Sequence, residues 1–354
     1  MNGGHSTARL LLPISLALSI GSCSKSEPPA APGPTLNARP EHTFQHAREV
    51  WTVSFSPDSQ LLATASVDAT VKIWRVADRS LVRTLTHPAG VTWASFSPDS
   101  LSIASTSYDN IVRLWRVSDG ALLESLAGHS DVPWTVAFSP DNQWLASAGA
   151  DKDIIVWRLP DGVRVQTLRG HALTVWSVTF SPDGQLLASG SFDRTLKLWR
   201  PTSAQAIRTL TGHTQAILDV AFSPDGQLIA SGGDDSTVRL WHVGSGENIR
   251  TLRTDPRHVY TIGFSPDGRF LASGSRDRGM VGEAVQNFFG SGSKSETMQI
   301  WRVGDGARVQ TLAAHADDVH SVQFSQDGAW LASASSDHTA ILWRLDQSVR
   351  RPGT

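Results

Sequence analysis

The sequence contains a single cysteine, Cys23, among its 354 residues. A disulfide within the chain and a metal site built from several cysteines are therefore excluded. Basic and acidic residues are nearly balanced, with 31 Lys and Arg against 33 Asp and Glu. Arg9 is the one charged residue before Cys23, so residues 23–354 carry 30 basic and 33 acidic side chains. This balance does not indicate the excess of basic residues that is typical of proteins that bind nucleic acid.

Sequence motifs of common enzyme classes are also absent. The chain has no Gly-x-Ser-x-Gly motif, which would place a serine nucleophile on a sharp turn. It has no glycine-rich loop of the phosphate-binding or dinucleotide-binding type, and its glycines fall at predicted turns instead. The sequence alone therefore disfavours serine hydrolase and nucleotide chemistry.

The chain also lacks a hydrophobic run long enough to cross a membrane. Its leading apolar stretch, residues 10–20, has 11 residues, whereas a membrane-spanning helix needs about 20. With one positive charge before it and small residues after it, the stretch predicts a secretory signal peptide over residues 1–22.

The residues that end this stretch, Ile20-Gly21-Ser22-Cys23, resemble the lipobox of bacterial lipoproteins. The resemblance implies that the signal is cut before Cys23 and that this cysteine is the lipid attachment site, which anchors the chain to a membrane. Residues 23–40 are rich in Pro, Ala and Ser and predict an extended tether. We expect a lipid-anchored protein of the bacterial cell envelope, on the periplasmic face or at the outer membrane, and Ser24 favours the outer membrane.

One phrase recurs seven times in the rest of the chain. Its fourth copy reads FSPDGQLLASGSFDRTLKLWR, and its first residue returns at spacings of 41, 42, 42, 42, 42 and 60 residues. The copies begin at Phe55, Phe96, Phe138, Phe180, Phe222, Phe264 and Phe324. An aspartate follows each phenylalanine by 13 residues, and a tryptophan follows that aspartate by 6 residues, except in the sixth copy, where 18 more residues intervene. A fixed period of this length indicates stacked supersecondary units.

Each unit predicts four short antiparallel strands with turns between them. In the fourth unit the predicted strands are residues 163–168, 174–180, 185–191 and 196–200. Seven such sheets can bury their faces against one another in a ring, so we predict an all-β, seven-bladed propeller over residues 41–347. Only a short polar stretch follows Trp343, so we expect residues 41–46 to supply the last strand of the seventh blade, and residues 348–354 to be a disordered tail.

These units resemble the WD40 repeat family over residues 41–347. The resemblance implies a buried hydrogen-bond network in each blade between a histidine, a strand serine or threonine, the turn aspartate and the tryptophan. Three units carry the full set with the family's Gly-His pair: His129, Ser147, Asp151 and Trp157; His171, Ser189, Asp193 and Trp199; His213, Ser231, Asp235 and Trp241. The sixth unit has Asp255 at the histidine position, and we expect Arg257 or His258 to compensate.

The recurrent His, Ser and Asp invite a catalytic interpretation, which we reject. A hydrolase needs one nucleophile, whereas the same trio recurs at the same offsets in nearly every unit. A metal site over residues 315–320, which contain two histidines and two aspartates, is disfavoured because His315 belongs to the network. We therefore expect no enzymatic activity, no cofactor and no metal.

A ring of aromatic side chains is the stronger functional signal. Two positions in each unit, four residues before the phenylalanine and one before the turn aspartate, often carry large rings. In the WD40 family the first position lines the mouth of the central channel, where peptides often dock, and the second lies nearby. We predict a partner-binding surface made of Trp51, Trp134, Trp176, Phe192, Tyr260 and His320, together with Phe288 and Phe289 from an insertion at residues 279–297. The alternative is that these rings only pack the channel rim.

The sequence therefore predicts a membrane-anchored monomer that serves as a scaffold for proteins or peptides and does not bind nucleic acid. Two alternatives stay open. One is a propeller enzyme of the envelope, which would need an asymmetric cluster of charged groups at the axis. The other is an outer-membrane assembly factor, by analogy with propeller lipoproteins whose repeats are of another type.

Overall fold

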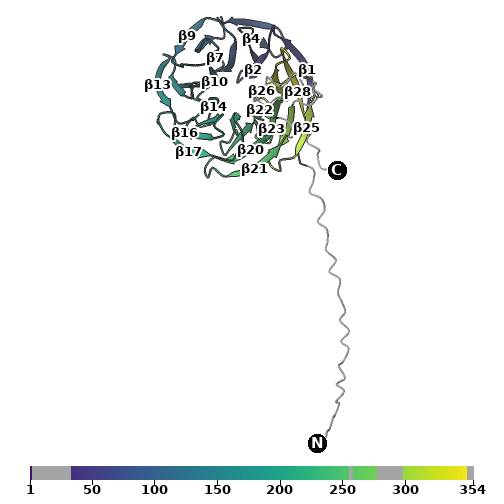
Figure 1. The fold of residues 1–354 in the computed structure, drawn as a ribbon. Helices are drawn as coiled ribbons and strands as arrows, with labels where there is room; N and C mark the ends of the chain where they lie inside the picture. Colours follow the sequence, from purple (N-terminus) through teal and green to yellow (C-terminus); the bar gives the residue numbers. More distant parts are fainter. Residues whose placement is uncertain (2–32, 255–257, 277–297, 349–354) are drawn as a thin grey trace, which may run out of the picture. The chain divides into compact units, whose positions relative to one another are not determined.

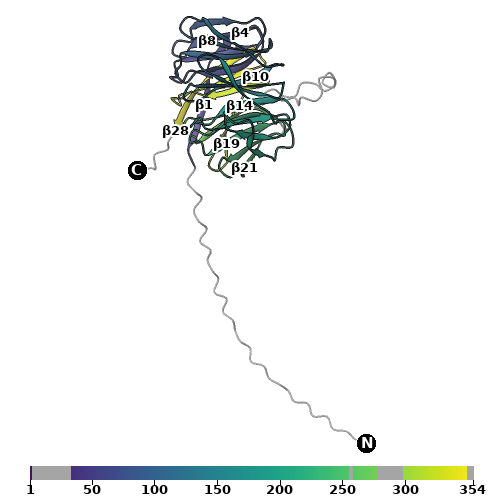
Figure 2. The same ribbon diagram turned by 90° about the vertical axis from the view of Figure 1, so that its left-hand side faces the viewer.

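The computed structural model describes Met1 and residues 33–254, 258–276 and 298–348. In this part of the chain the backbone forms strands β1 to β28, grouped into seven four-stranded antiparallel sheets. Figure 1 views the ring of sheets along its axis, and Figure 2 views it from the side. The predicted all-β propeller with seven blades of four strands is thus confirmed. Over the same residues no helix is long and apolar enough to cross a membrane.

The first four blades follow the chain without interruption. Each begins with the innermost strand and ends with the outermost strand. Blade 1 holds β2 (Val50–Phe55), β3 (Leu61–Ser66), β4 (Thr70–Arg75) and β5 (Leu81–Thr86); blade 2 holds β6 (Val91–Phe96), β7 (Ser102–Ser107), β8 (Ile111–Arg116) and β9 (Leu122–Ala127). Blade 3 holds β10 (Pro133–Phe138), β11 (Trp144–Gly149), β12 (Ile154–Arg158) and β13 (Val163–Leu168); blade 4 holds β14 (Val175–Phe180), β15 (Leu187–Ser191), β16 (Leu196–Trp199) and β17 (Ala206–Leu210).

Blades 5 and 6 continue in the same strand order, and blade 7 closes the ring. Blade 5 holds β18 (Ile217–Phe222), β19 (Leu228–Gly233), β20 (Thr237–His242) and β21 (Asn248–Arg253). Blade 6 holds β22 (His258–Phe264), β23 (Phe270–Arg276), β24 (Met298–Arg302) and β25 (Arg308–Leu312). Blade 7 combines β26 (Val319–Phe324), β27 (Trp330–Ser335) and β28 (Thr339–Ser348) with β1 (Thr35–Gln45) from the start of the propeller.

The sequence repeat and the blade are offset by one strand. Residues 163–168 precede the fourth phenylalanine, yet as β13 they pair with β12 of blade 3. Short turns favour pairing of consecutive antiparallel strands, so the strand after each tryptophan stays with its own sheet. The buried apolar clusters then lie between neighbouring blades: one of them joins Ile154 and Leu168 of blade 3 to Val178 and Trp199 of blade 4.

Strand β1 pairs with β28 over its whole length, from Thr35 against Ser348 to Gln45 against Thr339. This strand closes the ring, but it begins six residues before the expected position 41. Residues 35–40, expected in the tether, therefore belong to the sheet, and β28 reaches one residue past the expected end. These residues alternate between exposed and buried, as strand residues do. Leu36 and Ala38 are each only 4% exposed and pack on blade 6, which holds this part of the chain in the sheet.

The turn after each innermost strand needs a left-handed residue at its fourth position. In blade 4 the backbone N–H of Gly184 donates to Ser181 O at 2.8 Å, with a φ of 70° at the glycine. Glycine adopts this conformation without steric cost. Blades 1 to 3 instead place Ser59, Ser100 and Asn142 there, with φ between 58° and 63°.

Five blades carry a complete buried network, which blade 4 illustrates. Nδ1 of His171 lies 2.8 Å from Oδ2 of Asp193, and its Nε2 lies 2.7 Å from Oγ of Ser189. The indole N–H of Trp199 donates to the same serine oxygen at 2.8 Å. Because a carboxylate can only accept, Nδ1 carries the proton and Nε2 accepts from the serine hydroxyl. The same contacts join His46, Thr64, Asp68 and Trp74; His129, Ser147, Asp151 and Trp157; His213, Ser231, Asp235 and Trp241; His315, Ser333, Asp337 and Trp343.

Burial and hydrogen bonding act in opposite directions on these titratable groups. Burial alone would raise the pKa of Asp193, but hydrogen bonds from His171, Thr195 and the Ala172 N–H outweigh it and hold that pKa below its usual value. Burial lowers the pKa of His171, and Asp193 offsets part of this effect. The lowered carboxyl pKa means that Asp193 stabilises the fold above the ordinary carboxyl pKa and loses that contribution as the pH falls through the lowered value.

Blade 2 lacks half of the network. His87 reaches Ser105 at 2.8 Å, and Trp115 donates to that serine at 2.9 Å, but Asp109 pairs with Arg113 at 2.6 Å instead of with the histidine. Two donors that hold the aspartate in other blades are missing, since the residue after His87 is a proline without an N–H and residue 111 is an isoleucine without a hydroxyl. Burial, reinforced by the Arg113 charge, lowers the pKa of His87 to about 4.

In the described part of blade 6 the tryptophan half of the network is present. The indole N–H of Trp301 donates to Ser273 at 3.0 Å, and Asp255, Arg257 and Asp277 lie outside the described residues. His258 does not replace the missing histidine. Its Nδ1 contacts the backbone oxygen of Asp234 in blade 5 and lies 3.9 Å from the carboxylate of that residue. The expectation that His258 restores the network is therefore wrong, because its place at the start of β22 directs it to the neighbouring blade.

Because β1 closes the propeller, we expect truncation of one of its buried aromatic side chains to reduce stability strongly. Phe44 is 1% exposed and packs between blades 7 and 1. We expect Phe44→Ala to reduce the free energy of unfolding by about 3–5 kcal/mol, measured from urea unfolding curves. Thr43→Ala, at the exposed neighbouring position, is the matched control and should change it by less than about 0.5 kcal/mol. Equal stability of the two variants would show that β1 does not hold the ring closed.

The defect in blade 2 predicts a stabilising repair. Pro88→Ala, Ile111→Thr and Arg113→Lys together restore the donors found in the other blades, so Asp109 can accept from His87. We expect a gain of about 1–3 kcal/mol at pH 7.5 from the new hydrogen bonds, measured by thermal unfolding.

The same variant tests the pH dependence of blade 2. Because the folded pKa of His87 is about 4 and lies below the unfolded value of 6.5, the neutral histidine stabilises the wild type above pH 6.5. This contribution is lost as the pH falls through about 4. Between pH 6.5 and about 4 the repaired protein should therefore lose less stability than the wild type. Parallel curves of stability against pH for the two proteins would contradict the assignment.

Candidate functional site

The aromatic residues predicted from the repeat meet at one end of the innermost strands. Trp51, Trp134, Trp176 and Tyr260 start or lie near the start of β2, β10, β14 and β22, one in each of blades 1, 3, 4 and 6. With Tyr108, Phe192 and His320 they make up what we call the aromatic cluster. Tyr108 stands directly before the turn aspartate of blade 2, as Phe192 does in blade 4, but it was not included in the predicted binding surface.

Members of the aromatic cluster pack against one another across the axis of the propeller. Trp51 of blade 1 lies 5.6 Å from Trp134 of blade 3, 6.2 Å from Trp176 of blade 4 and 6.4 Å from Tyr260 of blade 6, measured between ring centroids. His320 of blade 7 stacks on Trp51 at 4.9 Å with only 6° between the planes. Blade 2 has the small Thr92 at the equivalent position, which lets the rings of blades 1 and 3 meet. The aromatic residues therefore fill the channel mouth instead of only lining it.

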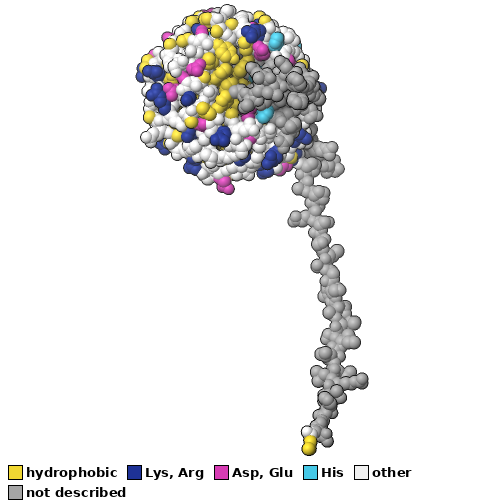
Figure 3. All heavy atoms as spheres, in the orientation of Figure 1, with side chains coloured by type: hydrophobic (Ala, Val, Ile, Leu, Met, Phe, Trp, Pro, Cys, Tyr) yellow, Lys and Arg dark blue, Asp and Glu magenta, His cyan; other side chains and the backbone are white. Residues whose placement is uncertain are grey.

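The aromatic cluster is buried at its centre and open at one side. Trp176, Tyr260 and His320 are at most 8% exposed. Trp51, Trp134 and Phe192 are half-buried, and Tyr108 is 38% exposed. Tyr108, Trp134, Trp176 and Phe192 form a continuous row, with successive centroids 5.7, 4.5 and 5.2 Å apart. Hydrophobic side chains gather near the middle of the face seen in Figure 3.

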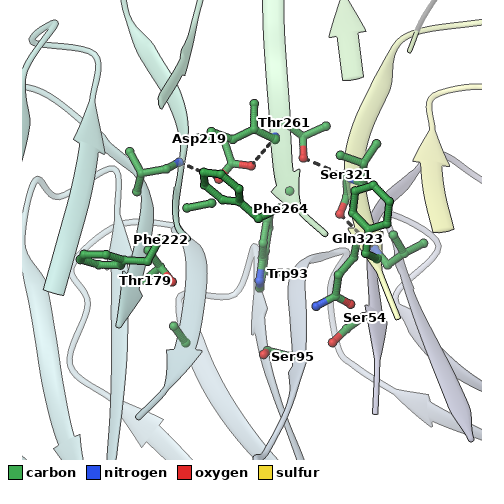
Figure 4. A pocket seen from close by; sticks show the side chains of 18 of the residues that line it. Ser54, Trp93, Ser95, Thr179, Asp219, Phe222, Thr261, Phe264, Ser321 and Gln323 are labelled. Atoms are coloured by element: carbon green, nitrogen blue, oxygen red, sulfur yellow. Dashed lines mark hydrogen bonds between the residues drawn. The ribbon is translucent and has the colours of Figure 1, made fainter. Parts of the chain in front are cut away.

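A cavity of about 470 Å³ lies along the axis, lined by the innermost strands beyond the aromatic cluster. Figure 4 shows side chains that line it, among them Trp93 of blade 2 and Asp219 of blade 5. Sequence reasoning did not single out either residue. Three residues before each phenylalanine stand Thr52, Trp93, Thr135, Ser177, Asp219, Thr261 and Ser321, so comparison of the units would have revealed one large ring and one charge among hydroxyls.

Asp219 joins three neighbouring blades. Its carboxylate accepts from the Ser177 hydroxyl of blade 4 at 2.8 Å, from its neighbour Val220 N–H at 2.9 Å and from Ile262 N–H of blade 6 at 2.9 Å. Burial raises the pKa of Asp219 to about 6, although the hydrogen bonds to Ile262, Ser177 and Val220 act in the opposite direction. The position is thus a structural link between blades, and among the described residues that line the cavity Asp219 has no second carboxylate beside it to act as a partner in acid–base chemistry.

The repeated His, Ser and Asp do not form accessible catalytic groups. The serine or threonine hydroxyl of each complete network is buried and already binds both the histidine and the tryptophan, so it cannot reach a substrate. In the described ranges, no three His, Cys, Asp or Glu side chains are placed to hold a metal ion. Within the stretch 315–320, His315 binds Asp337 and Ser333, and His320 contacts Ser336. Cys23 and the insertion with Phe288 and Phe289 lie outside the described residues.

Sequence comparison links the chain to proteins with the same repeat. The family model described as "WD domain, G-beta repeat" matches seven times, at residues 38–75, 79–116, 120–158, 162–200, 204–242, 246–280 and 306–344. These matches cover well over half of the chain.

Individual relatives match over short segments. The chain is 57% identical over 37 residues, 10% of its length, to the WD repeat-containing protein WDS homolog of Arabidopsis thaliana. It is 41% identical over 66 residues, 19% of its length, to the nuclear distribution protein PAC1 of Arthroderma otae, and 42% identical over 55 residues, 16% of its length, to protein HIRA of Gallus gallus. The matched segments span 7%, 14% and 5% of these relatives, so their activities and partners do not transfer to this chain.

Each of the seven family matches begins with the outermost strand of one blade and continues into the next blade, and in five of them the complete set of contacts between histidine, serine or threonine, aspartate and tryptophan recurs at the same offsets. Propellers of this type generally serve as scaffolds for protein interaction. The chain belongs to the WD40 repeat family.

Proposed function

We propose that this protein is a lipid-anchored scaffold of the bacterial cell envelope that binds protein or peptide partners through the open side of the aromatic cluster. The observation that carries the proposal is the continuous row of Tyr108, Trp134, Trp176 and Phe192, in which Tyr108 meets Trp134 edge-on and the other rings stack, and whose two ends are partly exposed. Large aromatic side chains are the residues that most often dominate binding energy at protein interfaces.

The surroundings of the aromatic cluster support a protein partner of limited size. Leu173, just before β14, is 48% exposed, and its backbone oxygen accepts from the hydroxyl of Ser191, the residue before Phe192. It therefore adds apolar area close to the Phe192 end of the row. The rigid stacking of the cluster means that few side chains lose freedom on binding, which favours affinity. Carboxylates at Asp131 and Asp318 belong to the connections that lead into β10 and β26, so basic residues flanking an apolar anchor would find complementary charge.

The insertion at residues 279–297 belongs to the same proposal on sequence grounds. It connects β23 to β24, and the equivalent turns of the other blades carry Tyr108 and Phe192, which belong to the aromatic cluster. The pair Phe288-Phe289 would add apolar contact area for a partner. The membrane anchor rests on Cys23 and the preceding signal-like sequence.

Binding through the aromatic cluster predicts a selective effect of Trp134. We expect Trp134→Ala to reduce the yield of cross-linked partners in intact cells tenfold or more, because a half-buried tryptophan contributes about 2 kcal/mol or more when it is a hot spot. The readout is cross-linking followed by mass spectrometry. Trp144→Ala is the matched control, since Trp144 is also half-buried and lies at the opposite end of blade 3. If both variants lose cross-linked partners to the same extent, or if neither variant loses them, the aromatic cluster is excluded as the binding surface.

The lipid anchor predicts a change of compartment. Cys23→Ala should remove incorporation of labelled fatty acid and shift the protein from the membrane fraction to the soluble fraction, because no acyl chain can then be attached. Ser26→Ala should leave both properties unchanged. In a host with two membranes, Ser24→Asp should move the protein from the outer to the inner membrane in a density gradient. Membrane association of Cys23→Ala at the wild-type level would rule out the anchor.

A further inference from the structure

The axial cavity of about 470 Å³ carries polar groups at two levels. Figure 4 shows Asp219, Thr261 and Ser321 at one level, and Ser54, Ser95, Thr179 and Gln323 at a second level, nearer the lower edge of the figure. The volume lies within the range of roughly 300–1,000 Å³ that is typical of small-molecule sites. The two levels differ in how their hydrogen-bonding capacity is used, and this difference indicates what the cavity can bind.

The side chains of the first level are engaged in contacts between blades. Asp219 accepts from Ile262 N–H, Thr261 accepts from Val322 N–H at 3.1 Å, and Ser321 accepts from Val53 N–H at 3.4 Å. These side chains link consecutive innermost strands and have little capacity left for a ligand. They fix the shape of the cavity and place one carboxylate in its wall.

The second level has unused donors. Gln323 accepts from Phe55 N–H at 2.5 Å through its amide oxygen, and within the described ranges its amide NH₂ has no protein partner. The indole N–H of Trp93 likewise finds no acceptor in that part of the chain, although this side chain is half-buried and lines the cavity. The hydroxyls of Ser95 and Thr179 make only long contacts, of 3.4 and 3.5 Å, to the next carbonyl of their own strands.

The chemistry of these groups selects a ligand class. Hydroxyls, an amide NH₂ and an indole N–H can all donate to oxygen atoms of a ligand, and the hydroxyls can also accept. The Asp219 carboxylate in the same wall disfavours an anion. Trp93 presents an aromatic surface, whose negative face attracts polarised C–H groups. We infer that the cavity binds a neutral polyhydroxylated molecule of about the size of a monosaccharide, held between Trp93, Thr179 and Gln323.

The site is distinct from the aromatic cluster and independent of the protein partner proposed above. The cluster fills the axis at the starts of the innermost strands, whereas the cavity extends to Phe222, Phe264 and Phe324 at their ends. A ligand therefore enters from the end that carries the Ser-Pro-Asp turns, three of whose prolines, Pro182, Pro224 and Pro266, also line the cavity.

The test uses the full chain, purified in a detergent without a sugar headgroup, and three neutral probes: methyl α-D-glucopyranoside, N-acetyl-D-glucosamine and myo-inositol. Saturation-transfer NMR at millimolar probe concentration should detect binding of at least one of them. Trp93→Thr should weaken that binding tenfold or more, equivalent to about 1.4 kcal/mol. Threonine is chosen because Thr52, Thr135 and Thr261 occupy the equivalent position in three other blades, so the variant should fold.

Two further variants separate binding from folding. Thr179→Val keeps the shape of the side chain but removes its hydroxyl, and it should also weaken the bound probe. Trp134→Ala, in the aromatic cluster, should leave probe binding unchanged. Absence of binding for all three probes, unchanged affinity in both Trp93→Thr and Thr179→Val, or tighter binding of D-glucose 6-phosphate than of D-glucose would overturn the inference.

Discussion

The propeller depends on one buried hydroxyl in each blade. In blade 4 the oxygen of Ser189 receives the indole N–H of Trp199 and donates its own proton to His171, which in turn holds Asp193. The histidine lies in the connection from the previous blade, so these bonds attach that connection to two strands and a turn of the next blade. The histidine, serine and tryptophan are buried and the aspartate is partly buried, so each would be costly to leave unpaired, which makes the contacts mutually dependent. In blade 2, which lacks two of the donors that hold Asp193 in blade 4, Asp109 pairs with Arg113 instead of with the histidine.

The axis of the ring shows how one repeated position can acquire different roles. At the start of the innermost strands, tryptophans from non-adjacent blades stack across the axis and close it. Three residues before each phenylalanine, hydroxyls link neighbouring blades, while Asp219 and Trp93 depart from the pattern. A closed ring brings all seven copies of a position within reach of one axis, so variation between copies creates a surface or a cavity with distinct sides. An exposed aromatic face at one end and a polar cavity at the other are the two results here.

Much of the fold could be predicted because the repeat carries its own physical explanation. The alternation of residues 175–180, the Ser-Pro-Asp turn and the tryptophan strand identify the blade, and strand β1 completes the seventh sheet. The start of β1 was missed because residues 35–40 were judged by composition, whereas Leu36 and Ala38 alternate into the interface with blade 6. The role of His258 was also misjudged, because its distance along the chain from the missing position says nothing about the blade that it faces.

The sequence by itself determined the number of blades, the strand order and the residues of the buried network, because each follows from local periodicity and from the need to pair buried polar groups. Only the tertiary structure decided that Trp51 meets Trp176 across the axis and that Trp93 lines a cavity. Those contacts join residues of different blades, over distances that depend on the size of side chains such as Thr92 in between. A repeat specifies which residues occupy equivalent positions, but only the closed ring determines which of them touch and which leave space between them.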